Sequence, residues 1–232
     1  MDGFKAAFKS RHVILPVIHV ENIEQATSNA LIAFKEGSDG VFLINHRISH
    51  KRLFEAAAGV REKFPAFWMG VNCLDLYPKD VFGKISKLNF RIDGVWADNA
   101  MINEFAELQF GAGTISRAYL VSGWSGLYFG GVAFKYQRLV TELEEAARIA
   151  ADFMDVVTTS GPATGEAAEV EKIRRIKSAI PFKPLAVASG ITPENIQDYT
   201  PFADCFLVAT GISKSFFEID RNRLRQLIKN VR

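Results

Sequence analysis

Short apolar runs recur along the whole chain and alternate with polar stretches of helical periodicity. Four of these runs follow an aspartate, in the segments FKEGSDGVFLIN, NFRIDGVWADN, DFMDVVTTSG and PFADCFLVATG. The aspartates are Asp39, Asp93, Asp155 and Asp204. Each interval between them has room for two strand and helix units of about 30 residues. The pattern therefore predicts a fourfold repeat of paired strand and helix units.

Four further apolar runs lie between the first four, in the segments HVILPVIHV, AFWMGVN, GLYFGGVAF and PLAVASG. Eight nearly continuous apolar runs are typical of parallel strands that are buried on both faces. The intervening stretches have helical spacing, as at Val170, Ile173 and Ile176. We therefore predict an α/β protein with one domain, residues 1–232, that forms a closed (β/α)₈ barrel. An open Rossmann-like sheet is the alternative, but no glycine-rich loop follows the first run.

Two segments fall outside the eight units. The first residues, MDGFKAAFKSRH, predict a short helix that covers the floor of the barrel. Residues 111–126, GAGTISRAYLVSGWSG, are rich in turn-forming residues and too long for an ordinary connection, which favours an inserted hairpin or lid before the fifth strand.

Composition narrows the functional classes. Hydrophobic residues make up 48% of the chain and charged residues 23%, which is typical of a folded domain with a sizeable core. The net charge of +2 is spread along the chain and indicates neither nucleic acid nor a membrane surface as partner. No apolar stretch is long enough to span a bilayer. Cys73 and Cys205 both lie in apolar runs, so we expect a cytoplasmic protein without disulfides or zinc.

The ends of the last three predicted strands are rich in glycine and hydroxyl side chains, in VVTTSGPATGE, VASGITPEN and VATGIS. Barrels commonly bind phosphate at the loops after strands 7 and 8. Glycine lets backbone N–H groups approach an anion, and a helix beginning near Thr192 would add a partial positive charge. Any one of these glycines could instead serve an ordinary turn. We predict a phosphorylated small-molecule ligand, bound by Ser160, Gly161, Thr164, Gly165, Ser189, Gly190, Thr210, Gly211 and Ser213.

Polar residues that close an apolar run are the candidates for catalysis, because barrel enzymes carry their catalytic groups at the carboxyl ends of strands. Asp98 could transfer a proton or could cap the next helix. Lys135 could neutralise a phosphate, act as an acid or form a Schiff base, or could be a surface lysine. His19 could face the pocket or the core. No metal site, no cofactor and no particular oligomeric state is predicted, although homo-oligomers are left open.

With these residues in view, the chain resembles the BtpA-like family of TIM-barrel proteins. The resemblance is densest in DVVTTSGPATGEAAEVEKIRRIKSAIP, PLAVASGITPENIQDY and ADCFLVATGISK. It implies a phosphate-binding barrel. The chain departs from the family pattern at Glu21-Asn22, Ile44, Ala97 and around Lys135. Family members usually carry there a Leu-Pro-Gly-like turn, a Glu, an Arg, and an acid with histidines, in that order. The strand ends SGITPEN and ATG are also similar to those of phosphoribosylanthranilate isomerase and related barrels.

Three functional hypotheses follow. The first is an isomerase, lyase or transferase that acts on a sugar phosphate or a nucleotide-like substrate, with Asp98 as the general acid or base and Lys135 or His19 assisting. The second is phosphoribosyl transfer, because DVVTTSGPATG is similar to the loop of adenine phosphoribosyltransferase, although only Asp155 stands where that loop has paired acids. The third is a non-catalytic assembly or regulatory factor that keeps the anion pocket as a sensor.

Overall fold

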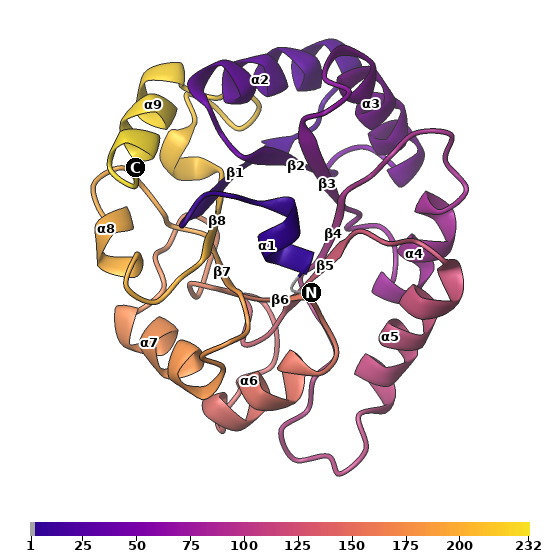
Figure 1. The fold of residues 1–232 in the computed structure, drawn as a ribbon, viewed down its shortest axis with the longest axis vertical. Coiled ribbons are helices and arrows are strands. Elements are labelled where there is room, and N and C mark those ends of the chain that lie inside the picture. Colours follow the sequence, from indigo (N-terminus) through magenta and orange to yellow (C-terminus); the bar gives the residue numbers. More distant parts are fainter. Residues whose placement is uncertain (1–2) are drawn as a thin grey trace.

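Eight parallel strands close into a barrel in the order of the chain (Figure 1). The computed structural model describes residues 3–232. The barrel closes between β8 and β1, where Val13 pairs with Cys205 and Pro16 with Val208. The prediction of a (β/α)₈ barrel is therefore confirmed. Its strands are β1 (Val13–His19), β2 (Gly40–Ile44), β3 (Trp68–Asn72), β4 (Gly94–Ala97), β5 (Leu127–Gly131), β6 (Val156–Ser160), β7 (Leu185–Ala188) and β8 (Cys205–Val208).

Helices surround the barrel and bury their apolar faces against it (Figure 1). Asn22 caps the first of them, because its side chain accepts from the backbone N–H of Gln25 at 2.9 Å, while Gln25 accepts from the N–H of Glu21 at 3.1 Å. The helices are α2 (Ile23–Glu36), α3 (His50–Lys63), α4 (Pro78–Ile85), α5 (Phe110–Ser122), α6 (Leu143–Ala151), α7 (Val170–Ala179), α8 (Ile196–Tyr199), the 3₁₀ turn η1 (Thr210–Ile212) and α9 (Arg221–Lys229).

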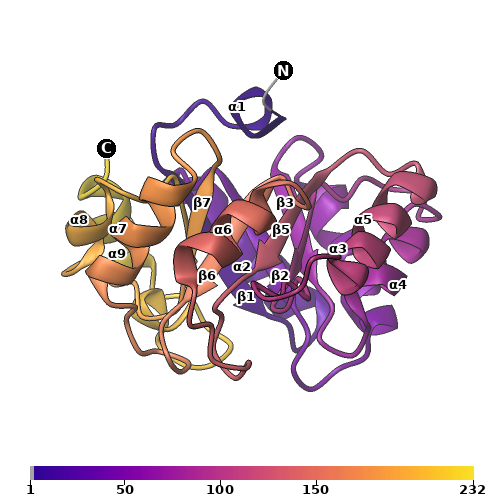
Figure 2. The same ribbon diagram turned by 90° about the horizontal axis from the view of Figure 1, so that it is seen from below.

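The first helix, α1 (Gly3–Ala7), lies across the amino-terminal end of the barrel (Figure 2). Phe4 and Phe8 are buried there and join the apolar cluster inside the barrel. The ring of Phe8 lies 5.1 Å from that of Trp68. The prediction that this segment covers the barrel floor is confirmed.

Large aromatic side chains fill the barrel along its axis. Phe42 contacts Trp68, Trp96 and Phe129, with ring centroids 5.2, 5.8 and 5.2 Å away. Glycine makes room for them, since a Cβ atom on Gly70 would lie 2.2 Å from the ring of Phe42. The interior is therefore a packed core and not a pore, as is general for this fold.

The four repeated aspartates have one structural role at the floor. Each accepts a hydrogen bond from the backbone N–H of a residue at the start of the preceding strand, at 2.8 or 2.9 Å. The backbone N–H of each aspartate donates in return to the carbonyl of the same residue. The pairs are Asp39 with Ile14, Asp93 with Met69, Asp155 with Tyr128 and Asp204 with Leu185. The repeat thus joins each odd-numbered strand to the even-numbered strand that follows it.

The prediction of a hairpin or lid within residues 111–126 is wrong. Those residues form most of α5 and the turn into β5. Tyr119 of this helix stacks on Phe82 of α4, with ring centroids 5.2 Å apart. The extra length lies just upstream, in the irregular loop 98–109 between β4 and α5.

Candidate functional site

A cavity of about 470 Å³ opens at the carboxyl ends of the strands. Most of the residues predicted from the sequence meet in it. They are His19, Asp98, Lys135, Thr164, Gly165, Ser189, Gly190 and Thr210. Its volume is typical of a small-molecule site.

Lys135, in the loop after β5, brings a positive charge to the cavity. Its ammonium donates to Ser189 Oγ at 3.0 Å, and its backbone N–H donates to Ser160 Oγ at 2.8 Å. Within residues 3–232, Ser189 is the one hydrogen-bond acceptor of the ammonium, which leaves two of its three donors for a ligand. Burial lowers the pKa of Lys135, and the neighbouring Asp98 opposes that shift.

Asp98 follows β4 directly and faces the same cavity. Burial raises the pKa of its carboxyl, although a hydrogen bond of 2.9 Å from the Asn72 side-chain amide to Asp98 Oδ1 and the charge of Lys135 both act to lower it. The next helix begins only at Phe110, so Asp98 does not cap it. A carboxyl group with a raised pKa can hold a proton closer to neutral pH and deliver it to a substrate.

The turns after β6, β7 and β8 pack directly on one another. A Cβ atom on Gly190 would lie 2.2 Å from the backbone nitrogen of Ala167, and one on Gly211 would lie 1.9 Å from the carbonyl oxygen of Ile191. Gly165 and Gly190 line the cavity, and their backbone N–H groups have no acceptor within the described part of the chain. The two amides therefore remain as donors for an anion beside Lys135.

The backbone is strained where it carries Ser189. This residue has a φ of 73°, in the left-handed region that a residue with a Cβ atom rarely adopts. Strain of this kind costs on the order of 1–3 kcal/mol and persists where the surroundings enforce it. Here it places the hydroxyl of Ser189 against the Lys135 ammonium.

Four of the predicted binding residues lie behind the cavity. Ser160 Oγ accepts from Lys135 and donates to the carbonyl of Gly161 at 2.8 Å, and Ser213 Oγ donates to the carbonyl of Ala209 at 2.8 Å. Gly161 and Gly211 allow close packing between neighbouring turns. The helix predicted near Thr192 begins only at Ile196 and is a single turn, so a helix dipole adds little to the site.

His19, the last residue of β1, is a neutral hydrogen-bond acceptor toward the cavity. Its Nδ1 lies 3.1 Å from the backbone carbonyl of Phe216, which can only accept, so Nδ1 carries the proton. Burial, followed by the proximity of His46, lowers the pKa of His19 to about 4. At neutral pH the Nε2 atom of His19 therefore has a free lone pair.

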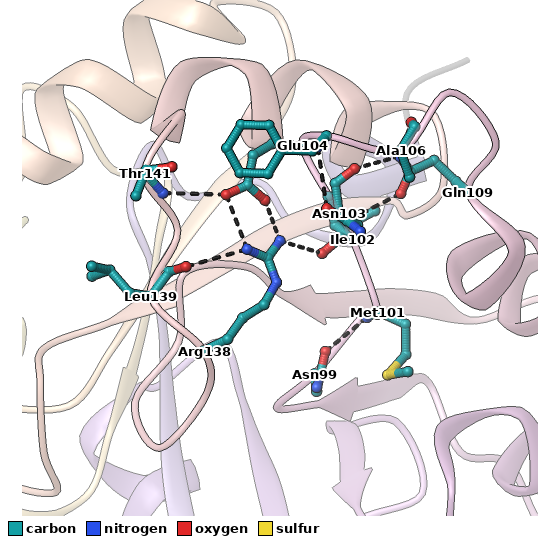
Figure 3. Close-up of polar contacts among 11 residues, drawn as sticks. Asn99, Met101, Ile102, Asn103, Glu104, Ala106, Gln109, Arg138, Leu139 and Thr141 are labelled. Atoms are coloured by element: carbon teal, nitrogen blue, oxygen red, sulfur yellow. Dashed lines mark hydrogen bonds and ion pairs between the residues drawn. The ribbon is translucent and has the colours of Figure 1, made fainter.

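An ion pair joins the loop that carries Asp98 to the loop that carries Lys135 (Figure 3). Both oxygens of Glu104 accept from the guanidinium of Arg138, and Arg138 also donates to the carbonyl of Ile102 at 3.1 Å. The side chain of Glu104 is fully buried and accepts from the N–H of Thr141 as well. Gln137 donates to the backbone carbonyl of Asp98. We call residues Glu104 and Arg138 the loop clamp.

The sequence did not single out every residue at the site. His46, Phe216 and Tyr136 line the cavity but were not among the predicted binding or catalytic residues. His46 lies two residues after the end of β2, so its position close to a strand end could have indicated it. Phe216 lies in the loop after η1, where no local pattern indicates that its ring turns back over His19.

Metal-ligand clusters and membrane-spanning helices are both absent from the part of the chain that the structure describes. Within residues 3–232, no group of three His, Cys, Asp or Glu side chains is placed to hold a metal ion. Over the same range, no helix combines the length and apolar character needed to cross a membrane.

The C-terminal part of the chain is similar to a known protein family. The sequence model of the BtpA family matches residues 131–232. These residues carry Lys135 and the turns after β6, β7 and β8. No curated protein matches the sequence.

Solved structures share the fold. (S)-3-O-geranylgeranylglyceryl phosphate synthase from Thermoplasma acidophilum, in complex with its substrate sn-glycerol-1-phosphate, has a TM-score of 0.69 at 15% identity, covering 99% of this chain and 96% of its own. Phosphoribosyl anthranilate isomerase from Thermus thermophilus has a TM-score of 0.65 at 15% identity, covering 94% and 97%. At these identities the likeness establishes the fold alone.

Proposed function

We propose that this chain, whose residues 131–232 match the BtpA family model, is an enzyme that acts on a phosphorylated small molecule in the cavity at the mouth of its barrel. The observation that carries the proposal is the ammonium of Lys135, held by Ser189 beside the unpaired amides of Gly165 and Gly190. Fixed N–H donors next to one cation are suited to a phosphate group. The two similar enzymes named above are a geranylgeranylglyceryl phosphate synthase and a phosphoribosyl anthranilate isomerase, which supports this substrate class.

Asp98 is the proton donor or acceptor in this proposal. It lines the same cavity as Lys135, and its raised pKa suits a group that exchanges a proton near neutral pH. Asn72 fixes one of its oxygens and leaves the other for a substrate. Lys135 and the two glycine amides hold the phosphate, while His19 accepts a hydrogen bond from a substrate hydroxyl or N–H group.

The phosphoribosyltransferase alternative gains no support from these contacts. Its loop would need acidic residues beside the ribose, but Asp155 lies at the amino-terminal end of β6 and bonds to the start of β5. Release of pyrophosphate from phosphoribosyl pyrophosphate in the presence of a nucleobase would restore that alternative.

Titration calorimetry with inorganic phosphate and with ribose 5-phosphate tests the anion site. We expect Lys135→Met to weaken both ligands by about tenfold or more, because it removes the one lysine or arginine charge among the residues that line the cavity. Lys9→Met is the matched control, since Lys9 is exposed at the barrel floor. Equal affinity of the wild type and Lys135→Met would refute the proposed phosphate site.

Turnover is tested separately on a panel of sugar phosphates, with product formation followed by mass spectrometry. For any compound that the wild type converts, we expect Asp98→Asn to bind it with similar affinity and to convert it at least about 100-fold more slowly. Binding without turnover across the whole panel would instead support a non-catalytic sensor.

A further inference from the structure

The two sides of the mouth cavity differ in chemistry. Lys135, Ser189 and Gly190, together with Thr164, Gly165 and Thr210, supply a cation, hydroxyl groups and amides from the ends of β5 to β8. The ends of β1 to β3 supply His19, His46 and Leu74. Asp98, after β4, belongs to neither group. A ligand that fills the cavity would therefore contact a cation and hydrogen-bond donors as well as ring side chains.

Three rings that line the cavity pack against one another. The ring centroid of His19 lies 4.1 Å from that of Phe216 and 4.8 Å from that of His46, and the rings of His46 and Phe216 lie 5.4 Å apart. All three residues line the cavity. We call His19, His46 and Phe216 the ring platform. Phe216 remains 45% exposed, so part of its ring is open to contact.

Hydrogen bonds from β1 and α2 hold the segment that carries Phe216 in place. Phe216 accepts through its backbone carbonyl from His19 at 3.1 Å. The next carbonyl, of Phe217, accepts from Gln25 and Asn29 of α2 at 2.6 and 2.7 Å. The guanidinium of Arg47 lies 5.7 Å from the centroid of the Phe216 ring. The platform is therefore formed before a ligand arrives, which lowers the entropic cost of binding to it.

We infer that the ligand of this site is a phosphate compound that carries a planar ring, with the ring on the His19, His46 and Phe216 platform and the phosphate at Lys135. This inference rests on the proposed function for the phosphate group of the ligand. It adds the chemical class of the group at the other end of the ligand. Aromatic surfaces bind flat heterocycles through stacking. The neutral His19 offers an acceptor for a ring N–H or hydroxyl group and does not compete with Lys135 for the phosphate.

The test compares three probes on the full-length chain by titration calorimetry: adenosine 5′-monophosphate, ribose 5-phosphate and adenosine. The first two share a sugar phosphate and differ by the ring. We expect adenosine 5′-monophosphate to bind at least about tenfold more tightly than ribose 5-phosphate, the order expected for one base stacked on one aromatic side chain. Phe216→Leu should remove most of that difference and leave the affinity for ribose 5-phosphate within about twofold.

Two further variants keep the result interpretable. Phe182→Leu is the matched control, because Phe182 is 95% exposed next to the barrel floor and should change neither affinity. Phe216→Trp keeps a flat ring and should retain the preference for adenosine 5′-monophosphate. A preference that Phe216→Leu and Phe216→Trp lose equally would overturn the stacking role.

The outcomes separate this inference from the proposed function. Equal affinities for adenosine 5′-monophosphate and ribose 5-phosphate, both weakened by Lys135→Met, would overturn the ring platform and leave the phosphate site standing. Binding of adenosine that Phe216→Leu abolishes, without binding of ribose 5-phosphate or effect of Lys135→Met, would support the ring platform and overturn the phosphate site.

Discussion

His19 shows how a single side chain links the site to the stability of the protein. Its pKa is about 4 in the folded protein, compared with an ordinary value of 6.5, chiefly because burial disfavours the charged ring. Since the folded pKa is lowered, the unfolded chain binds more protons between pH 6.5 and 4. The contribution of His19 to stability is therefore fully present above pH 6.5 and is lost as the pH falls toward 4.

We predict that His19→Gln removes part of this pH dependence. Glutamine can still donate to the carbonyl of Phe216 but does not titrate. Between pH 7 and pH 5 the free energy of unfolding should fall less in the variant than in the wild type, by on the order of 1–2 kcal/mol. Urea denaturation of both proteins at the two pH values measures these free energies. Comparing the variant with the wild type cancels the titration of the carboxylates that both proteins share. Identical pH dependence would mean that His19 is not held neutral.

At the scale of elements, the loop clamp determines how the loop 98–109 sits against the loop after β5. Glu104 is fully buried while Arg138 is 45% exposed, so the pair is only partly desolvated. Arg138 also supports the backbone at Ile102 and Leu139. Lys172 holds the loop after β5 from its other side, through the carbonyls of Ala133 and Ser160 at 2.6 and 2.7 Å. Asp98 and Lys135 thus lie in loops fixed by contacts outside the cavity.

We expect Glu104→Gln to loosen both loops. The substitution removes the charge that Arg138 pairs with and should lower the free energy of unfolding by about 1–3 kcal/mol. Hydrogen exchange should speed up in residues 98–109 and 132–142. Glu171→Gln is the control, because the pair of Glu171 with Arg174 is solvent-exposed and its loss should leave stability nearly unchanged. Equal effects of the two substitutions would contradict the role of the clamp.

The sequence predicted those elements whose hydrophobic pattern is contained within a short segment of the chain. Eight apolar runs predicted eight strands because parallel strands buried on both faces leave little room for polar residues. The prediction of a hairpin or lid within residues 111–126 failed because the glycines and serines there lower the helix propensity. In the structure, Ala112, Ile115 and Tyr119 stabilise the helix by packing α5 onto its neighbours. The glycines near Lys135 were predicted from their position after strands. Phe216, Glu104 and Arg138 were not, because their partners are distant in sequence.

At the scale of the whole molecule, the barrel separates stability from binding. The four aspartate contacts lie at the amino-terminal end of the strands, whereas Lys135, Asp98 and the glycine turns lie at the carboxyl end. This division is general for the fold. Changes at the floor should therefore alter stability and leave ligand affinity unchanged.

Asp155→Ala tests that separation. The change leaves the backbone N–H of Tyr128 without its carboxylate acceptor, and Tyr128 is 1% exposed, so we expect a loss of about 1–3 kcal/mol in the free energy of unfolding. The affinity for ribose 5-phosphate should stay within about twofold. Asp152→Ala, at an exposed neighbouring position, should change neither quantity. A loss of affinity in Asp155→Ala at a temperature where it is fully folded would show that the two ends are coupled.

The aromatic packing of Phe42, Trp68, Trp96 and Phe129 restricts how a ligand can enter and leave the cavity. Because these rings block the axis and α1 covers the amino-terminal end, residues 3–232 leave no second opening along the barrel axis. Whatever enters at the rim must leave by the rim, so a departing molecule and an arriving one exclude each other. A converted ligand that is slow to leave would then act as a competitive inhibitor of the next one.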